Sequence, residues 1–176
     1  KVTFEDGSAL ESIADHAFSG CKALKEIIIP KSVTTTLGRS TFLRCKALQK
    51  VTFEDGSALE SIADYAFKDC VALNEIIIPK SVKTIGAYAF HECKALHSVT
   101  FEDNSSLNSI GHNVFYECDA LKEITIPESL STFVSKMKLD VQFNISTQKK
   151  TKRTKKSNST RTKKAKKHQS GRRSSS

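Results

Sequence analysis

Five cysteines are the residues of this chain with the most obvious capacity for chemistry. Zinc sites take cysteine pairs two to four residues apart, and the closest pair here is separated by 23 residues, so no zinc motif is present. If each cysteine lies in one coil of a repeat structure, neighbours stand about 5 Å apart, within reach of a disulfide. We favour a buried ladder of free thiols, because free cysteine is among the most buried residue types. The spacings are 24, 25, 23 and 25 residues, between Cys21, Cys45, Cys70, Cys93 and Cys118.

Histidine and acidic residues give no support to catalysis. His16 occupies the position that Tyr65 holds in the equivalent repeat, which indicates a variable exposed site. Three Glu-Asp pairs recur in every second coil, about 10 Å apart, which is too far for a shared proton or a common metal ion. The chain holds no His-Glu-x-x-His, Gly-x-Ser-x-Gly, Walker or Gly-x-Gly-x-x-Gly motif. We therefore predict no enzyme activity, no cofactor, and no catalytic or metal-binding residues.

An internal repeat positions all these residues. Residues 1–15 recur almost letter for letter at 50–64, and in looser form at 98–111. A second unit type, containing Ile-x-Ile-Pro-x-Ser, alternates with the first at 26–33, 75–82 and 123–130. Both share the skeleton Phe-x-x-Cys-x-x-Leu-x-x-(Ile/Val)-x-(Ile/Phe), in which a turn leads into a short strand with alternate residues inward. One unit is too small to close a core, so stacked units are expected to form a solenoid.

Residues 78–96 resemble the BspA-type (Treponema pallidum-type) leucine-rich repeat. They read Ile-Pro-Lys-Ser-Val-Lys-Thr-Ile-Gly-Ala-Tyr-Ala-Phe-His-Glu-Cys-Lys-Ala-Leu, and related units cover about residues 1–134 as five to six copies. The resemblance implies an α/β-type repeat solenoid, a right-handed superhelix with a short-stranded parallel sheet on its concave face. It also implies a non-catalytic module for protein–protein interaction or adhesion.

The outward strand positions form the candidate binding surface. They are expected to make a ribbon of threonine and isoleucine, edged by a row of charges of alternating sign that begins Lys1, Glu26, Lys50, Glu75. Solenoids commonly bind proteins on such an extended sheet face, although a merely solvated face is an equal alternative. The predicted contact residues for an unidentified protein partner are Thr3, Ile28, Thr52, Ile77, Thr100, Thr125, Lys50 and Glu75.

The C-terminal region departs from the repeat. In residues 135–146, apolar Leu139, Val141 and Phe143 alternate with polar residues, which predicts a capping strand. Residues 147–176 hold 13 Lys and Arg and no acid, and their one apolar residue is Ala165, so we expect a disordered tail. Its basic clusters indicate nuclear import or sequence-nonspecific binding of nucleic acid or another anionic surface, with a purely solubilising role as the alternative. These cluster residues are Lys149, Lys150, Lys152, Arg153, Lys155, Lys156, Lys163, Lys164, Lys166 and Lys167.

Charge and hydropathy separate the two regions. Residues 1–146 carry 15 Lys and Arg against 19 Asp and Glu, a net charge of −4, whereas the tail carries +13. No apolar run exceeds four residues, which excludes a membrane-spanning helix. The tail and the unpaired cysteines favour an intracellular, even nuclear, location, while the family resemblance favours the cell surface or secretion. Residue 1 falls within a unit, so we expect the natural chain to begin upstream.

Overall fold

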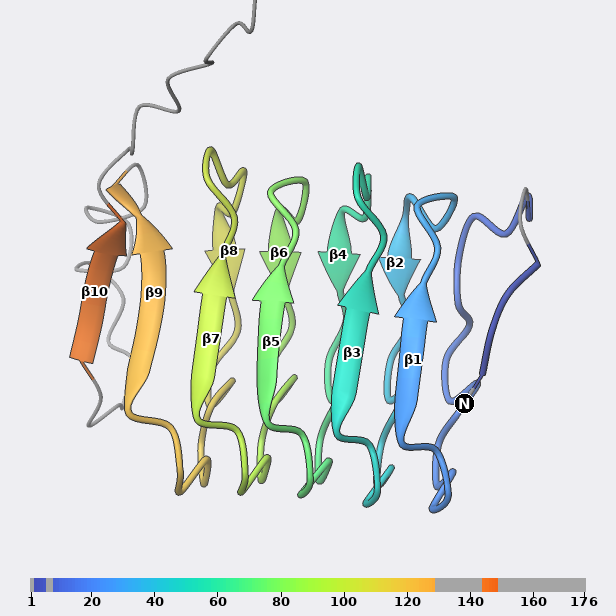
Figure 1. The fold of residues 1–176 in the computed structure, drawn as a ribbon, viewed down its shortest axis with the longest axis horizontal. Helices are drawn as coiled ribbons and strands as arrows, with labels where there is room; N and C mark the ends of the chain where they lie inside the picture. The colour runs from blue at the N-terminus through green and yellow to red at the C-terminus, as the bar shows by residue number, and fades with distance from the viewer. Residues whose placement is uncertain (1, 6–7, 129–143, 149–176) are drawn as a thin grey trace, which may run out of the picture.

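The computed structural model describes residues 2–5, 8–128 and 144–148. Its chain winds as a solenoid in which the four successive coils from β1 to β8 each contribute one strand to each of two sheets (Figure 1). The larger sheet holds six strands in the order β1-β3-β5-β7-β9-β10, and the smaller holds four in the order β2-β4-β6-β8. The strands of the larger sheet are β1 (Glu26–Ile29), β3 (Lys50–Phe53), β5 (Glu75–Ile78), β7 (Ser98–Phe101), β9 (Glu123–Pro127) and β10 (Asn144–Gln148). Those of the smaller sheet are β2 (Thr36–Leu37), β4 (Ser61–Ile62), β6 (Thr84–Ile85) and β8 (Ser109–Ile110).

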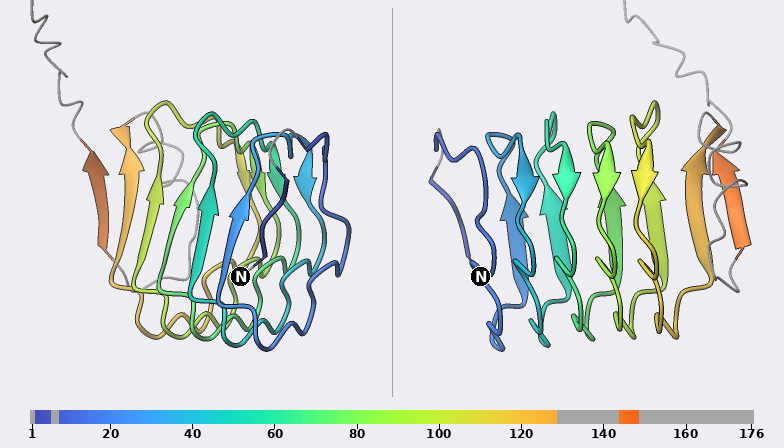
Figure 2. Two further views of the ribbon diagram at one scale, coloured as in Figure 1. Left: turned by 45° about the vertical axis from the view of Figure 1, so that its right-hand side comes forward. Right: turned by 180° about the vertical axis from the view of Figure 1, so that it is seen from behind.

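All strand pairs are parallel, and the two sheets form separate layers with turns joining them at both edges (Figure 2). The predicted repeat solenoid with a short-stranded parallel sheet is therefore confirmed. The structure refines it, because every named regular element of the described residues is a strand. The second sheet was not predicted. It arises from Leu/Val-x-x-Ile segments that follow strands of the larger sheet, such as 59–62 and 82–85. The isoleucines of successive segments pair, as Ile62 does with Ile85.

The core lies between the layers and follows the period of two along each strand. In β1, Ile27 and Ile29 are buried while Glu26 and Ile28 are exposed, and β5 repeats this pattern. Phenylalanines of successive coils stack nearly parallel, with ring centroids 5.1 Å apart for both Phe42–Phe67 and Phe67–Phe90. The stack runs through five coils, from Phe18 through Phe42, Phe67 and Phe90 to Phe115. Each ring thus fills the space beneath the next, as the repeat spacing predicted.

Four of the five cysteines form the predicted ladder of buried free thiols. Each of these Sγ atoms donates a hydrogen bond to the carbonyl oxygen of the phenylalanine that begins the preceding coil's motif, for example Cys70 to Phe42 at 3.1 Å. Burial raises the pKa of Cys45 to about 11, and raises those of Cys70 and Cys93 well above their usual value. Cys21, in the first coil with a cysteine, is exposed. The ladder therefore serves packing, and the raised pKa values of Cys45, Cys70 and Cys93 keep these three thiols protonated.

The turns opposite the large sheet impose an unusual backbone at two positions in each coil. Residues two before and two after each stacked phenylalanine have positive φ, such as Tyr65 (58°) and Asp69 (61°) on either side of Phe67. Only one of these ten positions is glycine, Gly20, so most coils accept the cost of a left-handed non-glycine residue. The repetition fixes the direction in which these side chains leave the turn, so that equivalent side chains of successive coils lie in rows.

The C-terminal cap and the disordered tail stay predictions, although one described strand lies in this region. β10 pairs in parallel with β9 over five residues, from Asn144 opposite Glu123 to Gln148 opposite Pro127. A final strand therefore exists, and it extends two residues into the segment predicted as tail. Leu139, Val141 and Phe143 lie outside the described residues, and so do all ten basic tail residues named above. Within the described part of the chain, no helix has the length and apolarity to cross a membrane.

Candidate protein-binding face

The structure brings the predicted contact residues into one row across the large sheet. Ile28 lies opposite Thr52, Ile77 opposite Thr100, and Thr100 opposite Thr125, as the repeat spacing required. Ile28 is 37% exposed and Ile77 is 56% exposed, whereas the threonines Thr52, Thr100 and Thr125 are half-buried. Thr3 is exposed beside the bridge that joins Val2 to Ile27. The outward face is thus a ribbon of threonine and isoleucine. No other described segment covers its two isoleucines.

The charged row beside this ribbon has the predicted register without the predicted ion pairs. Lys50 lies opposite both Glu26 and Glu75. Within the described residues, however, no ion pair of 4.0 Å or less joins these three, since the ion pairs present are Arg44–Asp69, Lys83–Glu60 and His91–Glu92. The long lysine side chain keeps its rotamer freedom because a solvent-exposed pair gains little from closing. The charges of this row therefore stay available to a ligand.

Pairing between β3 and β5 is interrupted. The register of this pair contains only Lys50 opposite Glu75, whereas β1–β3 and β5–β7 each pair over four residues. A groove of about 300 Å³ opens here, lined by both strands and the loops that follow them. The large sheet thus has a cleft at its centre, at the most exposed isoleucine.

The alternation of the two unit types removes one hydrogen bond from the ladder at this place. After β3, the Glu54 N–H donates to the Ile29 carbonyl at 3.0 Å, and after β7 the Glu102 N–H donates to Ile78 at 3.1 Å. After β5, the residue at the equivalent position is Pro79, which has no N–H to offer the preceding strand. The bond that extends the ladder is therefore impossible between β3 and β5. The β7–β9 pair, where Pro127 takes this position, likewise shows three paired residues instead of four.

Glutamate side chains strengthen the other interfaces and leave the groove acidic. Glu54 and Glu102 accept hydrogen bonds from the backbone N–H groups of Lys31 and Lys80, both at 3.0 Å, and so clamp the preceding coil. The groove lining contains four acids and one lysine: Glu54, Asp55, Glu75, Glu102 and Lys50. From the sequence, the spacing of the Glu-Asp pairs excluded a shared proton or metal ion and gave no sign of a groove. The residue directly after the strand is Glu54, Pro79 and Glu102 in three successive coils. This alternation of glutamate with proline was the signal that could have located the groove.

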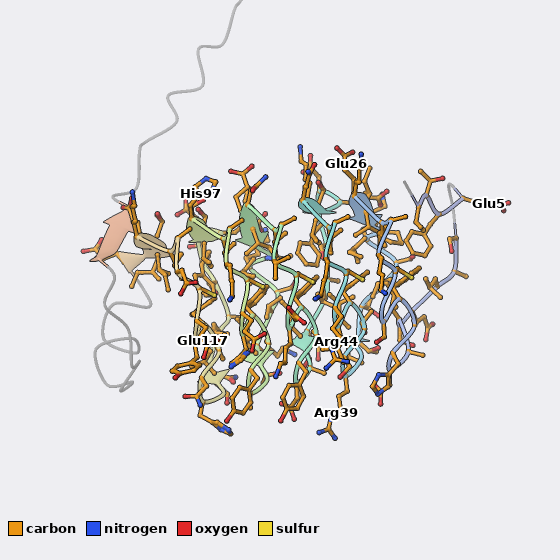
Figure 3. The ribbon with its side chains drawn as sticks, turned by 90° about the horizontal axis from the view of Figure 1, so that it is seen from below. Glu5, Glu26, Arg39, Arg44, His97 and Glu117 are labelled. Carbon is orange, nitrogen blue, oxygen red and sulfur yellow. The ribbon has the colours of Figure 1, made fainter. Side chains whose placement is uncertain are left out.

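The predicted binding residues are thus brought together only in part. Lys50, Thr52, Glu75 and Ile77 line the groove, whereas Ile28 and Thr100 lie on the same sheet face outside its lining. Figure 3 shows Glu26 on the side of the large sheet and Arg39 on the opposite side of the solenoid. An apolar wall with an acidic rim can accept a chain segment that carries apolar and basic side chains.

Comparison with known proteins identifies the architecture. The family model for the BspA type leucine rich repeat region matches residues 1–104 in six copies. The crystal structure of the Treponema pallidum leucine-rich repeat protein TpLRR is similar with 32% identity and a TM-score of 0.62, covering 69% of this chain and 54% of that one. The pneumococcal vaccine antigen PcpA is similar with 25% identity and a TM-score of 0.50, covering 72% of this chain and 45% of that one. The chain therefore spans about half the length of the solved structures it matches.

No curated protein sequence gives a significant match. The family assignment rests on the repeat model, which covers more than half of the chain, and on the shared solenoid architecture. The described structure repeats one stacked phenylalanine and one cysteine in each of five successive coils. This protein belongs to the BspA-type leucine-rich repeat family.

Proposed function

We propose that this chain is a non-catalytic protein-binding module whose contact surface is the outward face of the large sheet, centred on the groove between β3 and β5. The single observation that carries the proposal is the exposure of Ile77, at 56%, on the wall of that groove. A regular sheet face that was merely solvated would favour threonine or charged residues at this position. The exposed isoleucine instead offers apolar area that a partner can remove from water.

The partner we propose is an extended polypeptide segment with an apolar residue flanked by lysine or arginine. Four acids and one lysine line the groove, so its charge is complementary to a basic segment. The register between β3 and β5 is also the shortest in the large sheet, with one residue pair. We propose that the peptide lies extended along the groove over these two strands.

Adhesion is the setting that the family comparison favours. The similar proteins include one described as a pneumococcal vaccine antigen, which supports a secreted or cell-surface location for this chain. In that setting the groove would hold a segment of a protein on another surface. The basic tail supports a different alternative, an intracellular protein that binds nucleic acid or other polyanions, because residues 147–176 carry 13 positive charges and no acid.

Selection of peptides from a random displayed library tests the groove. We expect selected peptides to combine apolar and basic residues. Their affinity for the full chain should fall at least tenfold in Ile77→Glu, because the substitution places a charge where apolar area is to be buried. Glu75→Gln and Asp55→Asn should each weaken binding severalfold, and added salt should weaken it further.

Asn108→Glu is the matched control, since it adds the same charge on the coil segment that leads into β8, behind the large sheet. It should leave peptide affinity unchanged. Selected peptides that bind Ile77→Glu as tightly as the wild-type chain would contradict the proposal, provided that the two proteins have the same melting temperature. Loss of affinity in Asn108→Glu alone would place the binding surface on the other side of the solenoid.

A further inference from the structure

A buried histidine on the turn edge of the solenoid lacks a hydrogen-bond partner. The side chain of His91 is 10% exposed, and its Nδ1 atom makes no hydrogen bond. The ring is held between two tyrosines, with a centroid distance of 5.4 Å to Tyr88 in an edge contact and 5.4 Å to Tyr116 in a stack. An unsatisfied buried nitrogen is costly, so its position requires a further partner.

Two carboxylates of successive coils lie near this imidazole. Glu92 and Glu117 occupy the same position in their coils, two residues after Phe90 and Phe115, and both have a left-handed backbone with φ of 60° and 58°. The Glu92 N–H donates to the Tyr116 carbonyl oxygen at 3.0 Å, which fixes the two turns side by side. Ligand atoms of His91, Glu92 and Glu117 all lie within 4.8 Å of one another.

The charge of this row also favours a cation. Arg44, Asp69, Glu92 and Glu117 are equivalent residues of four successive coils, and Figure 3 shows Arg44 and Glu117 in one row along the solenoid. Arg44 lies 3.8 Å from Asp69 and offsets that charge. In the described part of the chain, no lysine or arginine lies within 4.0 Å of Glu92 or Glu117. Among the described residues, the His91 imidazole is therefore the one nearby basic group that the carboxylates of Glu92 and Glu117 share.

We propose that His91 Nδ1, Glu92 and Glu117 bind a divalent transition-metal ion of the zinc type, which joins two adjacent coils. In a tetrahedral zinc site with bonds of about 2.0–2.1 Å, neighbouring ligand atoms stand about 3.4 Å apart. His91 Nδ1 and Glu92 Oε1 are already separated by 3.5 Å. Glu117 is exposed, so its side chain can close the remaining distance, and water can take the open coordination position.

The mixed nitrogen and oxygen set decides the class of metal. Calcium and magnesium take oxygen ligands, whereas imidazole suits zinc and its neighbours in the first transition row. The sequence contains no usual zinc motif, because two ligands are adjacent and the third is 25 residues away in the next coil. The three ligands come together only when the repeats are aligned on their stacked phenylalanines. This inference is independent of the proposed binding groove.

Calorimetric titration of the full chain with zinc chloride tests the site. The Cys21→Ser background removes the exposed thiol, the other four cysteines being buried. We expect saturable binding of one ion per chain and a melting temperature that rises with zinc concentration. Glu117→Gln should raise the dissociation constant at least about tenfold, since even loss of a residue that only supports a ligand has effects of that size. His91→Gln should do the same.

His97→Gln is the matched control, because it removes an exposed histidine outside the cluster and should leave zinc affinity unchanged. Glu117 is exposed, so its variant is expected to keep the metal-free melting temperature, which separates lost ligation from lost folding. Absence of saturable zinc binding would overturn the proposal, and so would unchanged affinity in Glu117→Gln. Magnesium bound more tightly than zinc would contradict the assigned ligand chemistry.

Discussion

The Sγ atom of Cys93 donates a hydrogen bond to the carbonyl oxygen of Phe67, at 3.2 Å and across 26 residues of sequence. The same contact recurs in three other coils, so it joins each coil to the one before. Phenylalanine and cysteine thereby act together. One ring fills the layer, and one thiol donates a second hydrogen bond to a carbonyl that already accepts an N–H within its own turn, as Phe67 does from Cys70 at 3.2 Å. This repeated link explains why the two residues keep a fixed spacing in every unit.

Phe67→Ala should reduce the free energy of unfolding by about 3–5 kcal/mol, because Phe67 is fully buried in the middle of the phenylalanine stack. Urea denaturation followed by circular dichroism measures the loss. His16→Ala, at an exposed position, should cost less than about 0.5 kcal/mol. Equal losses in the two variants would show that the stack does not carry the stability of the coils.

Gly86→Ala should cost about 3 kcal/mol, because the added Cβ would overlap the backbone of Asp64 in the preceding coil. Gly56→Ala provides a matched comparison, since its Cβ would meet no atom within 4 Å and only the backbone angle, φ of 80°, opposes it. That second cost should be about 1–2 kcal/mol. Thermal and urea denaturation rank the two, and a larger loss at Gly56 would contradict the close approach of the coils.

Stability should fall in alkali through the buried thiols. The pKa of Cys45 is raised to about 11, and those of Cys70 and Cys93 are raised well above 9, whereas an unfolded thiol ionises near its ordinary value. The unfolded chain therefore releases protons that the folded chain retains. The free energy of unfolding should be unaffected by these groups below about pH 8 and should decline as the pH rises from about 9 towards 11.

Urea denaturation at pH 8 and pH 10 measures this decline. Cys45→Ala should show a smaller decline than the wild-type chain, because one of the raised pKa values is removed. Cys21→Ala is the control and should leave the decline as it is, since Cys21 is exposed. An identical pH dependence in all three proteins would contradict the assigned burial of the ladder.

Deleting residues 149–176 should abolish binding to heparin or DNA, since all 13 tail cations lie in that range and residues 1–146 carry a net charge of −4. The cut is placed after Gln148 so that β10 stays intact. If six tail charges contact phosphates, the logarithm of the binding constant should fall with the logarithm of salt concentration with a slope of about −5. Retained binding by residues 1–148 would place the basic function elsewhere.

The repeat pattern was enough to predict the solenoid, its parallel sheet and the inward phenylalanines, because period-two strands and a fixed coil length leave little freedom. The second sheet was missed because its strands are two residues long and carry no pattern of their own. The groove was missed because it depends on how far β3 and β5 pair with each other, which appears only when neighbouring coils are compared. His91 and Glu117 were missed because the residues of one coil give no sign of their neighbours in the next.

Hydrogen exchange of backbone amides in the complex with a selected peptide tests the central claim most directly. We expect bound peptide to slow exchange in β3 and β5, near Thr52 and Ile77, because both residues line the groove. Exchange in β4 and β6, whose register is complete, should be unchanged by the peptide. Protection confined to β4 and β6, with none in β3 or β5, would contradict the assignment of the large sheet as the binding face.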